Sequence, residues 1–137
     1  MFRLDGSVDA EIRAHARREL PNEACGYLSG LTTLYADGVH PLRNVDASPE
    51  HFAFEPKEQF DVLKRVRGAG KRLIGVYHSH PETPARMSEE DLQLLRDPSM
   101  IYVIYSVTDD RLNAFRLEDG VMLQIDVEAA SAETARK

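Results

Sequence analysis

The pattern of hydrophobic and polar positions predicts two long helices. In residues 7–20, one helical face is marked by Val8, Ile12 and either His15 or Ala16. Ser7 stands at the expected cap, and Pro21 ends the segment. A second helix is predicted from Pro56 through Arg67, with glycines following it. Its side chains that are spaced as helix neighbours are Phe60, Leu63, Lys64 and Arg67.

Shorter β-rich segments between the helices predict strands. The segment EACGYLSG, residues 23–30, is apolar and closes on a glycine. Residues 72–78 and 100–107 are nearly continuous apolar runs, as expected of strands that are buried on both faces. Asp37-Gly38 and Asp119-Gly120 are each flanked by β-rich residues, so we expect a hairpin at each pair.

A short helix is predicted at residues 88–96, with Leu92 and Leu95 facing inward. Helices and strands are therefore mixed along the chain, which indicates one α/β or α+β domain with a mixed β-sheet flanked by helices. We expect this domain to cover residues 1–127. Residues 128–137 are polar with weak periodicity, so we expect a frayed tail or a loosely attached helix there.

Composition argues against several classes of function. The chain of 137 residues has a formal net charge of −6, whereas a nucleic-acid surface needs clustered lysines and arginines. No run approaches the ~20 apolar residues that a membrane span needs. The charged N-terminal segment contains no apolar signal core, so we expect a cytoplasmic protein. The single cysteine, Cys25, excludes an internal disulfide and a cysteine-rich zinc site, and we expect it to be buried.

The strongest candidate for chemistry is the string HSHP at residues 78–81. His78 and His80 stand at i and i+2 of the predicted strand, so their rings share one face of the pleat and project beyond the strand end. Such a pair can chelate a borderline-soft divalent ion such as zinc. The other histidines show no partner pattern and are expected to be surface or boundary residues: His15, His40 and His51.

Asp91 completes a ligand set that suits catalytic zinc. Such sites commonly combine two nitrogens and one carboxylate with a water whose pKa falls toward ~7. Ser88 belongs to the same turn, and its hydroxyl is placed to reach an oxyanion. The competing interpretation of Ser88 and Asp91 is a helix capping box. Water activation also needs a carboxylate base, and sequence position leaves four candidates open: Glu23, Glu82, Glu89 and Glu90.

This order of residues, Glu23 followed by H-x-H-x7-S-x-x-D at residues 78–91, resembles the signature of the JAMM (MPN+) metalloproteases. The likeness to the compact bacterial members extends along most of the chain. It implies a single MPN/JAB1-like domain with a cytidine-deaminase-like layout. It also implies a role for each residue of the pattern: His78, His80 and Asp91 bind one Zn²⁺ per chain, Glu23 is the general base and Ser88 stabilises the oxyanion.

The same resemblance implies a class of substrate, because members of this family cleave bonds after the C-terminal tails of ubiquitin or ubiquitin-like proteins. We therefore expect a zinc peptidase or isopeptidase that cuts after the Gly-Gly end of a ubiquitin-like sulfur-carrier protein. The alternatives are a non-catalytic MPN-type scaffold and a zinc peptidase that acts on other small peptides. Neither a nucleic acid nor a membrane is an expected partner, and no pattern in the sequence predicts an oligomeric state.

Overall fold

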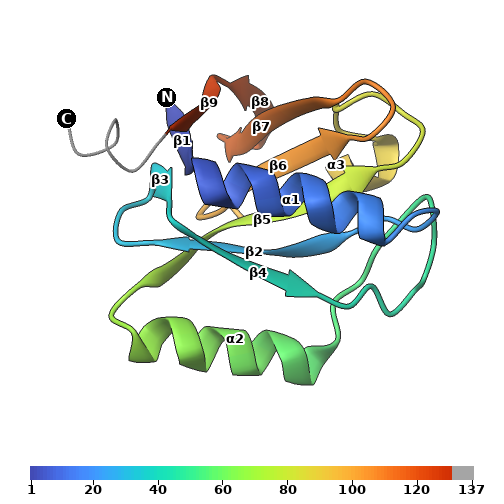
Figure 1. The fold of residues 1–137 in the computed structure, drawn as a ribbon. Helices are drawn as coiled ribbons and strands as arrows, with labels where there is room; N and C mark the ends of the chain where they lie inside the picture. The colour runs from blue at the N-terminus through green and yellow to red at the C-terminus, as the bar shows by residue number, and fades with distance from the viewer. Residues whose placement is uncertain (131–137) are drawn as a thin grey trace.

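The computed structural model describes residues 1–130, and its larger sheet is mixed, as predicted (Figure 1). Its six strands lie in the spatial order β4 (Gly38–Leu42), β2 (Cys25–Gly30), β5 (Arg72–His80), β6 (Ile101–Ser106), β7 (Arg111–Glu118) and β8 (Val121–Ile125). Strands β5 and β6 are parallel, and the other neighbouring pairs are antiparallel. Strand β5 therefore lies inside the sheet, with a partner on each edge.

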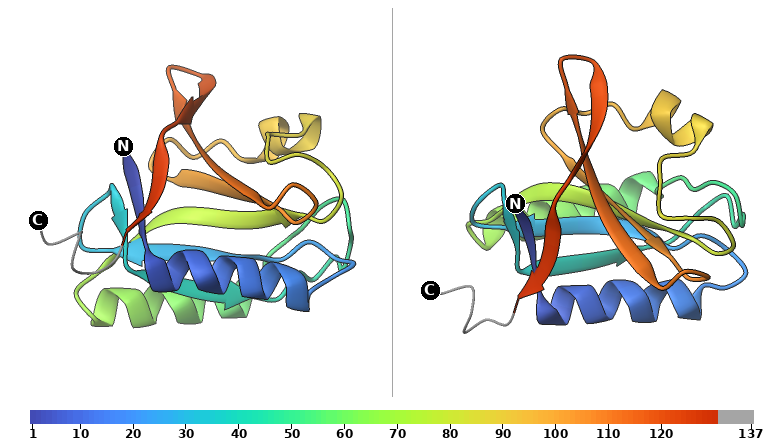
Figure 2. Two further views of the ribbon diagram at one scale, coloured as in Figure 1. Left: turned by 45° about the horizontal axis from the view of Figure 1, so that its top comes forward. Right: turned by 90° about the horizontal axis from the view of Figure 1, so that it is seen from above.

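A smaller sheet joins the two ends of the described chain. It contains β3 (Tyr35–Ala36), β1 (Phe2–Asp5) and β9 (Val127–Ala130), and both outer strands run parallel to β1. Figure 2 shows β9 beside the N-terminal strand. Neither β1 nor β9 was predicted from the sequence. The tail expected from residue 128 onward is wrong for residues 128–130, because they pair with β1, and residues 131–137 lie outside the described part.

Two helices cover opposite faces of the larger sheet (Figure 1). They are α1 (Gly6–Arg18) and α2 (Pro56–Gly68). Leu28 of β2 lies in the same buried cluster as Ile12 of α1, whereas its neighbour Tyr27 packs on the cluster that contains Val66 of α2. Successive residues of a strand point to opposite faces, so the sheet is covered on both sides. Among residues 1–130, no helix is long and apolar enough to cross a membrane.

The ends and faces of the helices differ in places from the prediction. The cap of α1 is Asp5 and not Ser7, because the Asp5 carboxylate accepts a hydrogen bond from the Ser7 backbone N–H at 3.2 Å. On α2, Phe60 is 58% exposed, and the buried side chains are Val62 and Val66. The third helix, α3 (Glu89–Leu94), is shorter than predicted. Its Leu92 is 42% exposed, so the inward orientation expected for that residue is wrong.

One predicted hairpin is present and the other is wrong. Asp119 and Gly120 both have positive φ, at 51° and 79°, and they connect the antiparallel strands β7 and β8. At Asp37-Gly38 no hairpin forms, because Gly38 pairs with Ser29 of β2. The two residues that precede Asp37 join β1 in the other sheet. A local Asp-Gly signal therefore marks a change of sheet at this point.

The register of β5 decides which side chains face which helix. Leu28 pairs with Gly75 and Ser29 pairs with Leu73, so Ile74 is an extra residue, as in a β-bulge. The bulge brings Ile74 and Tyr77 to the face that α1 covers. From Tyr77 onward the strand alternates regularly, and Val76 belongs to a cluster on the opposite face. His78 and His80 continue the alternation of Val76 and therefore point away from α1.

The side chains of His15 and Cys25 lie inside the core. His15 was expected at the surface or boundary, but it is buried and its Nδ1 lies 2.8 Å from the Tyr77 hydroxyl. The helical spacing leaves either His15 or Ala16 on the predicted apolar face, and both are buried, but the partner on β5 could not be predicted from the local sequence. Cys25 is buried as expected, and burial raises the pKa of its thiol to about 12.

The orientation of α2 predicts unequal effects for two substitutions. Val62→Ala should lower the free energy of unfolding by about 2 kcal/mol, because it removes buried methyl groups and leaves a cavity. Phe60→Ala removes a larger side chain from the exposed face and should cost about 0.5 kcal/mol. Urea unfolding of both variants measures the difference. A larger loss for Phe60→Ala would contradict the observed orientation.

Candidate metal centre

The C-terminal end of β5 presents two histidine rings that face each other. His78 pairs with Cys25 of β2 on one side and with Ile104 of β6 on the other, so neighbouring strands fix its backbone from both edges. The two Nε2 atoms lie 3.1 Å apart, and both histidines are buried. The strand was expected to end at residue 78, with the rings beyond it. Instead β5 continues through His80, because β6 pairs with it as far as Ser106.

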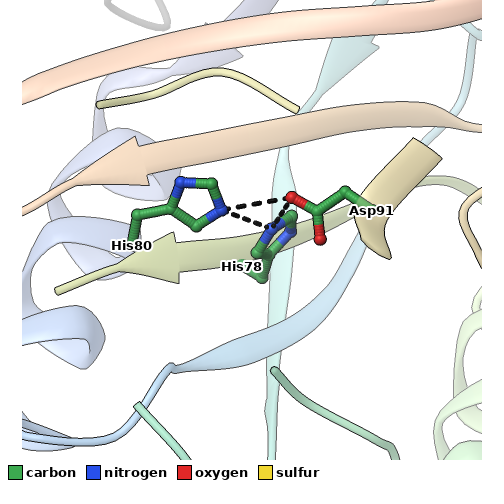
Figure 3. A group of neighbouring side chains, drawn as sticks. All are labelled: His78, His80 and Asp91. Carbon is green, nitrogen blue, oxygen red and sulfur yellow. Dashed lines mark hydrogen bonds and ion pairs between the residues drawn. The ribbon is translucent and has the colours of Figure 1, made fainter. Parts of the chain in front are cut away.

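Asp91 reaches these rings from α3. The Ser88 hydroxyl accepts a hydrogen bond from the Asp91 backbone N–H at 3.0 Å, and the Ser88 backbone N–H donates to Asp91 Oδ2 at 3.0 Å. This reciprocal capping box holds the carboxylate toward β5, where Oδ2 lies 3.2 Å from the Nε2 of each histidine (Figure 3). The capping box and the candidate ligand set are therefore two functions of the same side chains.

The hydrogen bond of His80 Nδ1 bears on where protons lie among His78 Nε2, His80 Nε2 and Asp91 Oδ2. His80 Nδ1 lies 2.8 Å from the Pro84 carbonyl oxygen, which only accepts, so Nδ1 carries a proton and the neutral ring presents a lone pair at Nε2. His78 Nδ1 is buried and has no hydrogen-bond partner within residues 1–130. The only polar groups that this ring meets are therefore on its Nε2 side. Positive charge between the three atoms relieves the repulsion of their lone pairs.

The pKa shifts of the three residues agree with this picture. Burial lowers the pKa of His80, but the hydrogen bonds with Asp91 and Pro84 outweigh it, so the net shift is upward. Burial raises the pKa of Asp91, but the hydrogen bonds with both histidines hold it below its usual range. Burial lowers the pKa of His78, which keeps that ring in the neutral form that binds metals. The site favours a cation beside an ionised carboxylate.

These residues fit a divalent metal ion. One potential ligand atom from each of His78, His80 and Asp91 lies within 4.8 Å of the others. Two imidazole nitrogens and one carboxylate oxygen form a donor set known from catalytic zinc sites, which keep a further position for water.

Glu23 lies just before β2, on the wall of a cleft of about 940 Å³ that His80 and Ser88 also line. Its backbone N–H donates to the Ser48 carbonyl at 2.8 Å, and its carbonyl accepts from Asn44 Nδ2 at 3.1 Å. The residue is 3% exposed, and its Oε1 has no hydrogen-bond partner in the described chain. Burial raises the pKa of Glu23 to about 8; His80 opposes this shift, whereas Asp91 and nearby glutamates add to it.

The structure brings the five predicted site residues to one end of β5. His78, His80 and Asp91 form the cluster, and Glu23 and Ser88 lie on the cleft wall. The other candidate bases line the same cleft, but they are exposed: Glu82, Glu89 and Glu90. Glu23 is the one candidate base that burial removes from water.

Two further residues support the site without a clear sequence signal. Phe52 packs on the cluster around Val76, and its ring also stacks on His78 at 4.8 Å between centroids. The Asn44 side chain donates to the carbonyls of both Glu23 and His51. This amide ties the segment that carries Glu23 to the loop that carries Phe52. Both contacts span distant parts of the chain, so no local pattern could reveal them.

Known proteins share most of this chain. Residues 6–118 match the model of a family described as prokaryotic homologs of the JAB domain. The chain is 34% identical over 115 residues to the CysO-cysteine peptidase of Mycobacterium tuberculosis, covering 81% of this chain and 79% of the relative. It is 34% identical to a desampylase of Haloferax volcanii (82% and 86% covered). It is 36% identical to a probable TtuB-protein conjugate cleaving protease of Thermus thermophilus (80% and 72% covered).

The fold is also shared with solved structures. A protein from Desulfitobacterium hafniense superposes with a TM-score of 0.87 at 38% identity, covering 96% of this chain and 94% of that one. A JAB1/MPN domain protein from Archaeoglobus fulgidus has a TM-score of 0.60 at 22% identity, with 93% and 97% covered, and shares the fold. The relatives from Mycobacterium tuberculosis and Thermus thermophilus are named as a peptidase and a probable conjugate cleaving protease, and this chain is likewise a hydrolytic enzyme, as expected. On these matches the chain belongs to the family of prokaryotic homologs of the JAB domain, and the JAMM (MPN+) resemblance of its sequence is confirmed.

Proposed function

We propose that this enzyme is a zinc-dependent peptidase that hydrolyses the peptide or isopeptide bond after the C-terminal Gly-Gly of a ubiquitin-like sulfur-carrier protein. The observation that carries this proposal is the convergence of two imidazole nitrogens and a carboxylate oxygen beside a cleft that holds a buried glutamate, whose Oε1 has no hydrogen-bond partner within residues 1–130. Relatives named for a CysO-cysteine substrate and for TtuB-protein conjugates support a substrate in which a carrier protein is joined to another group.

The proposed ligands of one Zn²⁺ per chain are His78, His80 and Asp91. When bound, zinc supplies Lewis acidity, which lowers the pKa of water and polarises a peptide carbonyl. The Pro84 carbonyl orients the His80 ring through Nδ1, and the Ser88 backbone N–H orients the Asp91 carboxylate. These contacts hold the His80 ring and the Asp91 carboxylate in the orientations that the proposed site needs.

Glu23 is proposed as the general base. Its carboxylate takes a proton from the attacking water, whose oxygen becomes part of the new carboxylate product. When the C–N bond breaks, the same group returns a proton to the leaving amine. A carboxyl group with an ordinary pKa is a weak base, whereas burial raises the pKa of Glu23 to about 8, close to a neutral working pH.

Ser88 is proposed to stabilise the oxyanion. Its Oγ accepts a hydrogen bond from the Asp91 N–H, which leaves the hydroxyl proton free to be donated. The residue lines the cleft together with Glu23 and His80, so this proton is available to a substrate carbonyl oxygen on which negative charge develops.

Zinc binding is predicted to depend on the cluster. Chelator-treated protein should take up one equivalent of zinc in isothermal titration, whereas His78→Ala and Asp91→Ala should bind it at least about a hundredfold more weakly, because each loses a ligand. His40→Gln changes a histidine outside the cluster and should bind zinc like the wild type. Unchanged affinity in His78→Ala would contradict the proposed ligand set.

Glu23→Gln is predicted to separate binding from catalysis. The variant keeps its volume and should retain one zinc per chain, but kcat should fall about 10²- to 10⁴-fold because no base remains. Glu118→Gln, at an exposed position on β7, serves as the control and should keep the wild-type kcat. Retained activity in Glu23→Gln would move the base to another carboxylate and refute this assignment.

The raised pKa of Glu23 also predicts a pH dependence of stability. Between pH 4.5 and about 8 the folded, metal-free protein keeps a proton on Glu23 that the unfolded chain has lost. The free energy of unfolding therefore falls by about 1 kcal/mol per pH unit as the pH rises through this window. Glu23→Gln removes this pH dependence. In urea unfolding, the free energy of unfolding of the variant should therefore rise relative to that of the wild type between pH 5.5 and 7.5. A constant difference would contradict the raised pKa.

The substrate class is tested with a ubiquitin-like carrier protein whose Gly-Gly end is extended by several residues. Zinc-loaded enzyme should cut after the second glycine, as read by intact-mass spectrometry. An Ala-Ala end should lower kcat/KM at least about tenfold, since side chains hinder an extended tail in a narrow groove. Equal cleavage of both ends and of unrelated peptides would favour a general peptidase of small peptides.

A further inference from the structure

The cleft beside His80 carries negative charge that the proposed reaction does not use. Besides Glu23, four carboxylate side chains line it, here called the rim carboxylates: Glu50, Glu82, Glu89 and Glu90. No lysine or arginine is among the lining residues of the described chain, and His80 is the one basic residue there. Apart from His80, the charged side chains that a substrate meets in the cleft are therefore all negative.

In the described part of the chain, the rim carboxylates have no positively charged partner, although other carboxylates do. Within residues 1–130, none of them forms an ion pair, whereas other carboxylates do: Asp9 with Arg13 at 3.2 Å and Asp37 with Lys71 at 3.0 Å. Glu23 Oε1, in the same cleft, is also without a partner and is buried. This second feature indicates a cleft built to receive polar groups from outside the chain.

Helix stability accounts for only part of this charge. Glu89 and Glu90 lie in the first turn of α3, where acidic side chains interact favourably with the helix dipole. Glu50 and Glu82 come from two separate loops, and no helix explains their sign. Bound metal does not remove the excess either. A divalent cation brings two positive charges and ionised Asp91 offsets one of them, so the four rim carboxylates still set the sign of the potential in the cleft.

We propose that the rim carboxylates select a positively charged segment on the leaving side of the scissile bond, as in a carrier protein joined to a lysine- or arginine-rich polypeptide. This inference rests on the proposed function. The Gly-Gly pair carries no charge, so the field acts on the residues that flank it, and the proposal assigns it to those beyond the scissile bond. A single amino acid attached through its amine keeps a free carboxylate next to the bond and is repelled. A lysine side chain within a basic protein brings no such carboxylate and is attracted.

Binding of short peptides tests the selection. Three labelled, C-terminally amidated peptides of equal length contain Gly-Gly followed by Lys-Lys, Ala-Ala or Glu-Glu. Zinc-loaded Glu23→Gln protein binds them without cutting, and fluorescence anisotropy gives Kd. We expect the Lys-Lys peptide to bind about tenfold more tightly than the Glu-Glu peptide at about 20 mM salt. The difference should nearly vanish at about 500 mM salt, where screening is strong. Equal affinities at low salt overturn the proposal.

A matched pair of variants, each made in the Glu23→Gln background, assigns the effect to the cleft. Glu50→Gln with Glu82→Gln should reduce the tenfold preference to about threefold or less. Glu118→Gln with Asp126→Asn removes the same charge from exposed positions outside the cleft lining, one before the β7–β8 turn and one after β8, and should leave the preference intact. If both double variants reduce the preference for the Lys-Lys peptide equally, the preference reflects the net charge of the protein, and the proposal is overturned.

Two further arms complete the test. A peptide with Lys-Lys before Gly-Gly and Ala-Ala after it should bind like the neutral peptide, and equal preference for this peptide overturns the assignment to the leaving side. Hydrolysis by the zinc-loaded wild type separates the two proposals. If no peptide or carrier protein is cut, the proposed function fails. If all three peptides are cut with equal kcat/KM at low salt, the proposed function stands and the charge selection fails.

Discussion

Repulsion between three electron-rich atoms is the constraint on which this site depends. His78 Nε2, His80 Nε2 and Asp91 Oδ2 lie 3.1–3.2 Å from one another in a buried place. Side chains in water would turn apart, since burying such groups without compensation costs several kcal/mol. Here strand pairing and a capping box prevent them from separating. The His80 Nε2 lone pair and the ionised Asp91 carboxylate attract a proton or a metal ion to this place, and the donor set of the three residues is the reason why we interpret it as a candidate metal centre.

The fold supplies this constraint through a few local devices. A bulge at Ile74 sets the alternation of β5, so His78 and His80 leave the face that α1 covers. Pairing with β6 through the last residue of β5 holds the second ring in the sheet. The following loop returns to α3, whose capping box aims Asp91 back at the strand. Within the loop, the Pro84 carbonyl fixes the His80 ring. Each device links a backbone feature to the direction of one ligand atom.

The range of each interaction decides whether the sequence could predict it. The ligand triad depends on spacing within 14 residues, on the i, i+2 pleat and on a capping box, and these local rules predicted it from the chain itself. Glu23 lies more than fifty residues upstream, so residue chemistry left several bases open and only the family resemblance singled it out. The parallel pairing of β1 with β9 and the hydrogen bond between His15 and Tyr77 join distant segments, so no local pattern could predict them. At Asp37-Gly38 the local sequence predicted a hairpin, but the tertiary fold pairs Gly38 with β2, so this prediction was wrong.

Charge connects the metal centre to the cleft in front of it. Burial keeps Glu23 basic, and the glutamates around it give the cleft one sign, so the same acidic surroundings serve the proposed catalysis and the proposed choice of substrate. Both depend first on a cation at the end of β5. The most direct test is anomalous diffraction at the zinc edge from crystals grown with zinc. The account predicts one peak per chain at about 2.0–2.2 Å from His78 Nε2, His80 Nε2 and an Asp91 carboxylate oxygen. A zinc peak elsewhere, with these three side chains turned apart, would contradict it.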